Sequence, residues 1–191
     1  WLLNVRGNDV DHTPLPLSFA VVHAAGEIDW FVAPDKLSDP VLTHLGDGVR
    51  VHAPEDLSAC LGALTGKRVW ACPDTGASWV FDRLAAAEVK IARGDDPVTM
   101  SKAVKNEAEL SGSRAAHKRD GAALVRFLHW LSDAAPGDGI DEMTVADKLA
   151  AFRAPGEYFR DLSFGTISGA GPNGAIVHYR VSEETNRLLG D

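Results

Sequence analysis

Cysteine is scarce in this chain of 191 residues, which contains only Cys60 and Cys72. Their number and spacing exclude the disulfide framework of a small secreted domain and the paired motifs of a zinc site. Both cysteines lie in apolar stretches, "LSACLGAL" and "RVWACP". The sequence therefore predicts two reduced, buried thiols in a cytosolic protein.

Long hydrophobic runs and an excess of positive charge are also missing. No apolar stretch approaches the roughly 18 residues of a membrane span, and no signal peptide is visible. The 27 Asp and Glu outnumber the 19 Lys and Arg, which gives a net charge of −8 at pH 7. The chain thus lacks the basic surface that nucleic acid or an anionic membrane would attract, and we expect neither as a partner.

The two ends of the chain are abrupt. The first residues, "WLLNVRG", begin inside a strand-like run without a preceding Met, and the last residues, "NRLLGD", stop equally suddenly. These ends predict a piece of a longer protein. We therefore expect that some functional residues lie outside this sequence.

The first half of the chain alternates between strand and helix patterns, which predicts an α/β fold. Helical patterns cover 54–66 and 75–87, between short runs rich in Val, Ile, Trp and Phe. The early strands follow one another without helices, so part of the sheet is expected to be antiparallel. The predicted strands are "WLLNV", "LSFAVVHA", "IDWFVA", "VRVHA", "RVWAC" and "EVKIA".

A long helix is the strongest local prediction in the second half. The polar residues 92–105 are expected to connect two domains. Asn106 and Glu109 then form an N-x-x-E capping pattern that opens a helix running to about Ala135. Its apolar stripe consists of Leu110, Leu124, Phe127, Leu128 and Leu131.

A second helix is expected to begin at Thr144, with Asp147 as a weaker capping partner. It should end near Pro155, because proline cannot continue a helix. Its apolar residues are Val145, Leu149 and Phe152.

The stretch "GAGPNG" has the spacing of a dinucleotide-binding fingerprint at Gly169, Gly171 and Gly174. Such a fingerprint needs a helix after the glycines, because the helix N-terminus binds the pyrophosphate. Here the β-branched and aromatic run "AIVHYRV" follows, and Pro172 removes a backbone donor from the loop. The sequence therefore argues against a nucleotide site.

The same region instead predicts two paired strands. "LSFGTISG" enters, "AIVHYRV" leaves, and Asn173–Gly174 supplies the positive-φ residues of a tight turn. On the outgoing strand, His178 is expected to point away from the face shared by Val177 and Tyr179. Taken alone, one histidine makes no catalytic constellation, and a partly buried histidine bonded to a carbonyl is the simpler interpretation.

Residues 163–180, "SFGTISGAGPNGAIVHYR", resemble a stretch of the cytosolic aminopeptidase P (Xaa-Pro aminopeptidase) family. These hydrolases belong to the M24 superfamily of creatinase, prolidase and methionine aminopeptidase. Three other stretches agree in the same order, so the resemblance covers essentially the whole chain. They are "WLLNVRGNDVDHTP" with its R-G-x-D-V core, "KAVKNEAELSGSRAAHKRDGAALVRFLHWL", and "ADKLAAFR" together with "LSFGTISG".

The resemblance implies a fold and a chemistry. The family's chains contain two related α/β domains and a pita-bread (α+β) catalytic domain. Residues 1–95 would then be most of the second α/β domain, of the creatinase N-terminal type and lacking its start. Residues 98–191 would be the truncated first part of the catalytic domain. Members of the family remove the N-terminal residue from peptides with proline in second position, using two divalent ions, usually manganese, that activate a bridging water.

The resemblance also implies which functional residues the chain holds. The family's metal ligands are two Asp, one His and two Glu, and the first Asp belongs to a D-S-G motif expected beyond "NRLLGD". None of the five is expected here, Asp191 is not counted among them, and the chain alone is expected to be inactive. His178 matches the histidine of the family's N-G-A-I-x-H-Y motif, so we predict that it is catalytic and substrate-binding. The histidines without such a match are His12, His23, His44, His52, His117 and His129.

Two questions stay open on the sequence. The loop from Arg6 to Asp9 either faces the active-site cleft or is a structural turn held by an Arg–Asp contact. The parent protein is either a cytoplasmic, homodimeric aminopeptidase acting on proline-containing peptides, a pita-bread pseudoenzyme that binds peptides or proteins, or a prolidase or creatinase. The presence of His178 argues against the pseudoenzyme, and the sequence of residues 163–180 fits aminopeptidase P better than prolidase.

Overall fold

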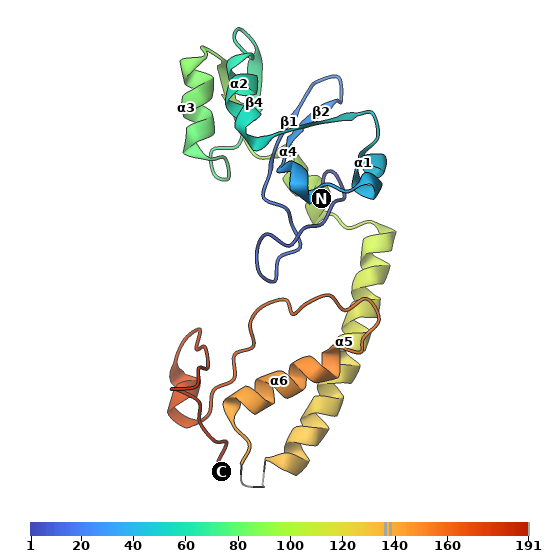
Figure 1. Cartoon of the computed structure of the whole chain (residues 1–191), viewed down its shortest axis with the longest axis vertical. Helices are drawn as coiled ribbons and strands as arrows, with labels where there is room; N and C mark the ends of the chain where they lie inside the picture. Colours follow the sequence, from blue (N-terminus) through green and yellow to red (C-terminus); the bar gives the residue numbers. More distant parts are fainter. Residues whose placement is uncertain (136, 138, 191) are drawn as a thin grey trace. The chain divides into compact units, whose positions relative to one another are not determined.

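The computed structural model describes residues 1–135, 137 and 139–190, and the chain forms two compact units, Trp1–Lys105 and Asn106–Asp191 (Figure 1). Each unit is described by itself. The predicted connection at 92–105 contains the end of strand β5 (Lys90–Arg93) and helix α4 (Pro97–Ala103). The assignment of 1–95 and 98–191 to two named domains stays a prediction.

Unit 1 is an α/β structure with two small sheets, as the alternating pattern predicts. β1 pairs with β2 antiparallel, β2 with β3 parallel, and β4 with β5 parallel. The expected antiparallel portion of the sheet is therefore present. The elements are β1 (Phe19–Val22), β2 (Ile28–Phe31), β3 (Val49–His52), β4 (Arg68–Ala71) and β5, the helices α1 (Asp39–Leu45), α2 (Leu57–Gly62), α3 (Ser78–Ala86) and α4, and the 3-10 helices η1 (Pro34–Lys36) and η2 (Pro54–Asp56).

The predicted strand "WLLNV" is wrong. The backbone N–H of Asn4 donates to the carbonyl of Trp1 at 2.9 Å, which closes a turn instead. Asn4 has a φ of 49°, a left-handed conformation that asparagine tolerates better than most residues. Local turn formation therefore prevails over the β-propensity of the neighbouring apolar residues.

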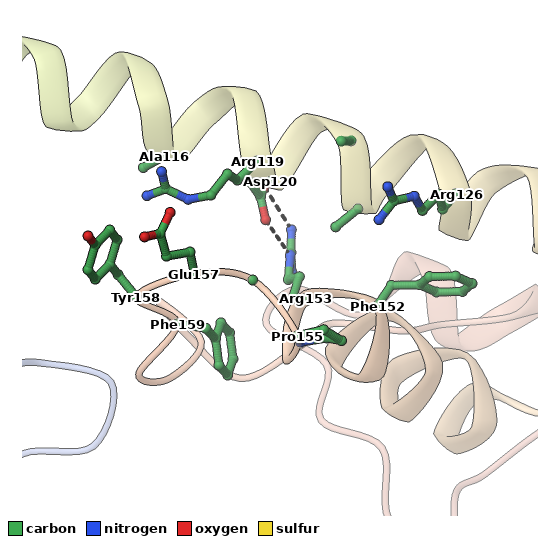
Figure 2. Close-up of a pocket in the computed structure, with 13 residues that line it drawn as sticks. Ala116, Arg119, Asp120, Arg126, Phe152, Arg153, Pro155, Glu157, Tyr158 and Phe159 are labelled. Atoms are coloured by element: carbon green, nitrogen blue, oxygen red, sulfur yellow. Dashed lines mark hydrogen bonds and ion pairs between the residues drawn. The ribbon is translucent and has the colours of Figure 1, made fainter.

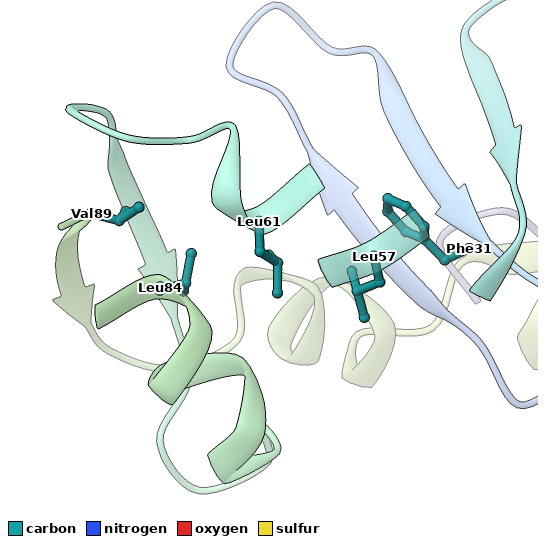
Figure 3. Packing of buried hydrophobic residues seen from close by; sticks show 5 residues of the cluster. All are labelled: Phe31, Leu57, Leu61, Leu84 and Val89. Atoms are coloured by element: carbon teal, nitrogen blue, oxygen red, sulfur yellow. The ribbon is translucent and has the colours of Figure 1, made fainter. Parts of the chain in front are cut away.

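The core of unit 1 is built around α2. Leu57 and Leu61 lie four residues apart and so share one face of the helix. They join Phe31 on β2 to Leu84 and Val89 beside the other sheet (Figure 3). Phe31 and Leu84 are almost completely buried, so a single apolar cluster connects both sheets.

The two cysteines are free, as predicted, but each is only partly buried. Burial raises the pKa of Cys60, which packs against the core of unit 1. Hydrogen bonds with Thr75 and with the backbone of Asp74 lower the pKa of Cys72. The expectation of two fully buried thiols is therefore wrong, because both thiols lie at the margin of the packed interior.

One buried charge lies on β2. Asp29 is paired in register with Arg50 on β3, whose Nε donates to its carboxylate at 2.7 Å. His23 and His52 approach the same carboxylate through Nε2 at 2.6 and 2.8 Å. The bonds from Arg50, opposed by burial and assisted by the two histidines, hold the pKa of Asp29 far below its ordinary value.

Unit 2 begins with the predicted helix α5 (Glu107–Ala134). The Asn106 side chain accepts from the N–H of Glu109, whose carboxylate accepts from the N–H of Asn106, both at 2.9 Å. The predicted capping box is thus confirmed. Pro136 and Asp138, which follow the predicted end of the helix at about Ala135, lie outside the described residues. No described helix combines the length and the apolar character required to cross a bilayer.

Helix α6 (Glu142–Arg153) begins two residues before the predicted Thr144. Asp141 is its N-cap, because the Asp141 carboxylate accepts from the N–H of Thr144 at 2.7 Å. The proposed capping role of Asp147 is therefore wrong, while the end near Pro155 is confirmed. Helix α6 packs against α5 (Figure 1). Phe152 makes an edge-to-face contact with Phe127, and the two ring centroids are 6.5 Å apart.

The predicted strand pair at 162–181 is absent from the described residues. Residues Gly171–Ala175 form a 3-10 helix, η3, with Pro172 in its first turn. A turn follows, in which the N–H of Tyr179 donates to the carbonyl of Ile176 at 3.2 Å. The physical reason is that a strand requires a partner, and within the described residues no strand lies beside either segment.

Asp29 generates a pH-dependent prediction. Its depressed pKa stabilises the folded state fully above the ordinary pKa of an aspartate, and this effect is lost progressively as the pH falls from that value towards the lower pKa of the folded state. We expect Asp29→Asn to reduce the free energy of unfolding of unit 1 by about 1–3 kcal/mol at pH 7, because the shared acceptor of Arg50 and the two histidines loses its charge and one of its two oxygens. The difference from wild type should shrink below about pH 4. Urea unfolding followed through the amide NMR signals of β2 and β3 measures it.

Asp47→Asn is the matched control, since Asp47 is exposed in the same unit. It should change stability little at any pH. A deficit of Asp29→Asn that is equally large at pH 3 and pH 7 would show that the charge of Asp29 is not what stabilises the sheet.

Candidate functional site

The site is built at the N-terminus of α6, where a carboxylate lies inside unit 2. Glu142 is the first residue of α6, and its side chain is fully buried. The carboxylate accepts from the N–H of Ala170 at 2.6 Å and from the N–H of Arg187 at 3.3 Å. It therefore joins two distant positions of the C-terminal segment to the start of the helix.

Two side chains complete this arrangement, which we call the Glu142 network (Glu142, Asn173, Tyr179 and Thr185). The Asn173 Nδ2 donates to both carboxylate oxygens, at 3.0 and 3.1 Å. The Tyr179 hydroxyl donates to Glu142 Oε2 at 2.7 Å. The carbonyl of Thr185 accepts from Asn173 at 2.9 Å. All four of these partners of the carboxylate, Ala170, Arg187, Asn173 and Tyr179, are donors, which matches the acceptor-only character of an ionised glutamate.

The network has a clear electrostatic consequence. Burial alone would raise the pKa of Glu142, but the hydrogen bonds from Ala170, Tyr179 and Asn173 outweigh it and lower the pKa. Burial, together with the neighbouring carboxylate, raises the pKa of Tyr179 against the opposing effect of Thr185. The ionised form of Glu142 and the neutral form of Tyr179 therefore stabilise each other.

His178 lies directly before the anchored Tyr179, on an exposed turn. It is the third residue of the turn Ile176–Tyr179 and has a φ of 55°. Val177 is 83% exposed whereas Tyr179 is 5% exposed. The prediction that Val177 and Tyr179 share a strand face opposite His178 is therefore wrong, because the backbone turns at His178.

The described residues do not fit a metal centre by themselves. Among residues 1–135, 137 and 139–190, no three His, Cys, Asp or Glu side chains are grouped so that they could hold a metal ion. The two carboxylates at the start of α6 have other roles, since Asp141 caps the helix and Glu142 is occupied by donors. Asp191 lies outside the described residues.

The contacts of the loop from Arg6 to Asp9 differ from the predicted Arg–Asp contact, and its facing the active-site cleft stays a prediction. The carboxylate of Asp9 accepts from Lys36 and from the N–H of Leu17, and these bonds lower its pKa. Arg6 donates to the carbonyl of Val5 at 2.9 Å and more weakly to Asn4. The proposed Arg–Asp contact is thus replaced by a Lys–Asp contact.

Most of the other histidines make local contacts. His23 and His52 bind Asp29, as described above. The remaining contacts are His44 with the carbonyl of Leu3 at 3.0 Å, His117 with the carbonyl of Ser113 at 2.8 Å, and His129 with Asp133 at 3.6 Å. These interactions give each ring a structural partner.

A groove of about 340 Å³ lies between α5 and residues 153–159 (Figure 2). Arg153 and Asp120 form a two-pronged ion pair across it, at 2.6 and 3.2 Å. The Arg119 guanidinium lies over the ring of Tyr158, 5.7 Å from its centroid. None of the residues lining the groove belongs to the Glu142 network or to the His178 turn, so the groove is not part of this site.

Sequence reasoning missed the structural roles of Glu142 and Asn173. Asn173 was expected in a hairpin turn, yet it is 8% exposed and donates into the interior. Glu142 resembles any acidic residue in a helix's first turn, which the helix dipole favours. One signal was available in the sequence. Asp141 and Glu142 are adjacent carboxylates, and only Asp141 is needed as the N-cap of α6.

Comparison with known proteins finds matches over both units. Residues 1–109 match the creatinase/prolidase N-terminal domain, and residues 111–191 match metallopeptidase family M24. The chain is 35% identical over 190 residues to a probable Xaa-Pro aminopeptidase P of Aspergillus clavatus, covering 94% of this chain and 29% of that protein. A probable Xaa-Pro aminopeptidase P of Penicillium rubens is 39% identical, with 94% and 31% covered.

A solved structure agrees with these matches. The X-prolyl aminopeptidase of Caenorhabditis elegans, described as a cytosolic enzyme with a di-nuclear active site, superimposes with a TM-score of 0.87. It is 30% identical, and the match covers 99% of this chain and 32% of that one. The chain thus spans about three-tenths of the length of the relatives it matches.

The Glu142 network generates a second prediction. Asn173→Asp places two carboxylates against each other inside unit 2, and like charges at short distance raise one pKa above its value in the unfolded chain. This variant should lower the Tm of unit 2 by roughly 10 °C at pH 7, and the loss should diminish as the pH is lowered towards about 4 and one carboxylate is protonated. Thermal unfolding at several pH values, followed by the NMR signals of α6, measures it.

Asn186→Asp provides the control, because Asn186 Nδ2 donates to the partly exposed Asp141 at 2.8 Å. The same substitution there faces a solvated carboxylate and should cost much less. Equal losses for the two variants, or a loss that is independent of pH, would contradict an ionised Glu142.

Proposed function

Because the chain belongs to the creatinase/prolidase N-terminal domain family and continues into the first part of an M24 metallopeptidase domain, we propose that the whole protein containing it is a dinuclear-metal aminopeptidase. Its reaction would remove the N-terminal residue from peptides with proline in second position. The support is the set of relatives carrying the name Xaa-Pro aminopeptidase P and the X-prolyl aminopeptidase structure. Because the chain spans about three-tenths of these relatives, the activity is proposed for the whole protein.

The metal centre is proposed to contain two divalent ions, specifically manganese. The description of the C. elegans enzyme as di-nuclear supports the number of ions. Since the described residues do not form a metal site, the ligands are proposed to come from the rest of the whole protein. When bound, such ions activate a water molecule and polarise a carbonyl group.

His178 is proposed to be the catalytic and substrate-binding residue that this chain contributes. The single observation that carries this role is its placement: an exposed imidazole at the tip of a turn whose next residue, Tyr179, is anchored in the interior. The ring is exposed, and within the described residues no hydrogen bond to it is present. An N–H of His178 can therefore donate to the substrate carbonyl and strengthen this bond as negative charge develops on the oxygen.

The remaining proposed properties concern the substrate, the location, the oligomeric state and the domains. Proline-containing peptides are the proposed substrates, in line with the names of the relatives. A cytoplasmic location is supported by the description of the C. elegans enzyme as cytosolic. We also propose a homodimer, with residues 1–95 as the second α/β domain and 98–191 as the start of the catalytic domain. Their support is the family resemblance of the sequence.

Substitution of His178 in the whole protein tests the function. We expect His178→Ala to lower kcat on an Xaa-Pro peptide by roughly 10²–10³-fold, the usual effect of removing one donor to a developing oxyanion. The metal content and the Tm should stay near wild type, because the side chain is exposed and is not proposed as a ligand. Steady-state kinetics, metal analysis and a melting curve give the three readouts.

His129→Ala is the matched control, since His129 is exposed on α5 and its side chain is 78% accessible. It should leave kcat unchanged. A wild-type protein that binds metal but cleaves no Xaa-Pro peptide would contradict the proposed activity. A normal kcat for His178→Ala would leave the activity standing and exclude the role of His178. The 191-residue chain alone is expected to show no turnover.

A further inference from the structure

We propose that Glu142 is a positioning residue which, through Tyr179 and Asn173, holds the His178 turn in the conformation that presents the imidazole to substrate. This inference rests on the proposed function of His178. Glu142 is buried at the N-terminus of α6 and does not itself contact substrate in this arrangement. Its effect passes entirely through the segment that it binds.

The His178 turn requires external support. A φ of 55° is unfavourable for any residue with a β-carbon, because the side chain approaches the following carbonyl. The turn itself is closed by a single backbone hydrogen bond of 3.2 Å between Tyr179 and Ile176. Such a conformation persists only where the surrounding structure determines it.

The support comes from both sides of the turn and ends on one carboxylate. On the C-terminal side, the Tyr179 hydroxyl donates to Glu142 at 2.7 Å. On the N-terminal side, Asn173 donates to both oxygens of Glu142 and also to the Tyr179 hydroxyl, the latter at 2.9 Å. Because both arms of the segment 173–179 are fixed to the same group, the residues between them have little freedom to move.

The carboxylate is itself held on a rigid element. Helix α6 is capped by Asp141 and packs on α5 through Phe152 and Phe127. The chain of contacts therefore runs from the helix pair through Glu142 and Tyr179 to the backbone of His178. Glu142 is fully buried and keeps one geometry, because four groups donate to its carboxylate. The donors are Ala170, Asn173, Tyr179 and Arg187.

A double-mutant cycle in the whole protein tests the proposal. Tyr179→Phe removes only the hydroxyl and is chosen because Glu142→Ala could unfold unit 2. We expect Tyr179→Phe to lower kcat on an Xaa-Pro peptide by roughly 10-fold, with KM and metal content near wild type, as for groups that orient a functional residue. In the His178→Ala background the same substitution should have no further effect on kcat.

Tyr158→Phe is the matched control, because Tyr158 is the other tyrosine of the chain and is 73% exposed. It should leave kcat unchanged in both backgrounds. A kcat for Tyr179→Phe equal to wild type overturns the proposal. An equal loss in the presence and absence of His178 also overturns it, since Tyr179 would then act through overall stability.

A second measurement separates this proposal from the proposed function. In the 191-residue chain, ¹⁵N relaxation of residues 176–180 should show an ordered turn for wild type and increased motion for Tyr179→Phe. An unchanged turn overturns the positioning role. Increased motion of the turn, combined with a normal kcat for His178→Ala, would support the role of Glu142 in ordering the turn. It would overturn the catalytic role of His178 instead.

Discussion

The structure of unit 2 depends on one constraint: the buried carboxylate of Glu142 must have donors. An ionised glutamate inside a protein is costly unless it is fully hydrogen-bonded. Here the donors come from Ala170, Asn173, Tyr179 and Arg187, all in the segment after α6. Backbone hydrogen bonds join residues 187–189 of that segment to residues 140–142, and the carboxylate binds Ala170, Asn173 and Tyr179 at the same place. Satisfying the charge therefore also orders the part of the segment from Ala170 to Tyr179.

The two units reach their stability in different ways. Unit 1 has a continuous apolar cluster around α2, and its buried Asp29 is an addition to an existing core. In unit 2 the buried hydrophobic residues that the structure describes are Ala123, Phe127 and Tyr179, while Phe164 and Val177 are 66% and 83% exposed. Hydrophobic burial contributes less there, and the polar network contributes correspondingly more to fixing one conformation. We therefore expect unit 2 to depend more than unit 1 on its buried polar network.

The features that the sequence predicts well are those that local chemistry decides. The capping box of Asn106 and Glu109 involves neighbours three residues apart and formed as expected. The alternating pattern of unit 1 and the creatinase and M24 fold class are confirmed by the structure and the matched families. The features that failed depend on distant partners. "AIVHYRV" has the composition of a strand, but within the described part of the chain no strand lies beside it. Glu142 binds Asn173 and Tyr179 across separations of 31 and 37 residues. No local pattern contains such a pairing.

The remaining question is why a histidine occupies a left-handed turn position that glycine would adopt without strain. Packing does not require the imidazole, since the side chain is exposed, and no described hydrogen bond holds it. The unfavourable φ is instead maintained from outside, by Tyr179 and Asn173 acting on Glu142. The backbone of His178 is thus unfavourable, its side chain is exposed, and a buried charge network stabilises the turn. This combination indicates selection for a function of the imidazole. The buried carboxylate and the strained turn are thus two parts of one arrangement, in which the interior of unit 2 determines the direction of a group at its surface.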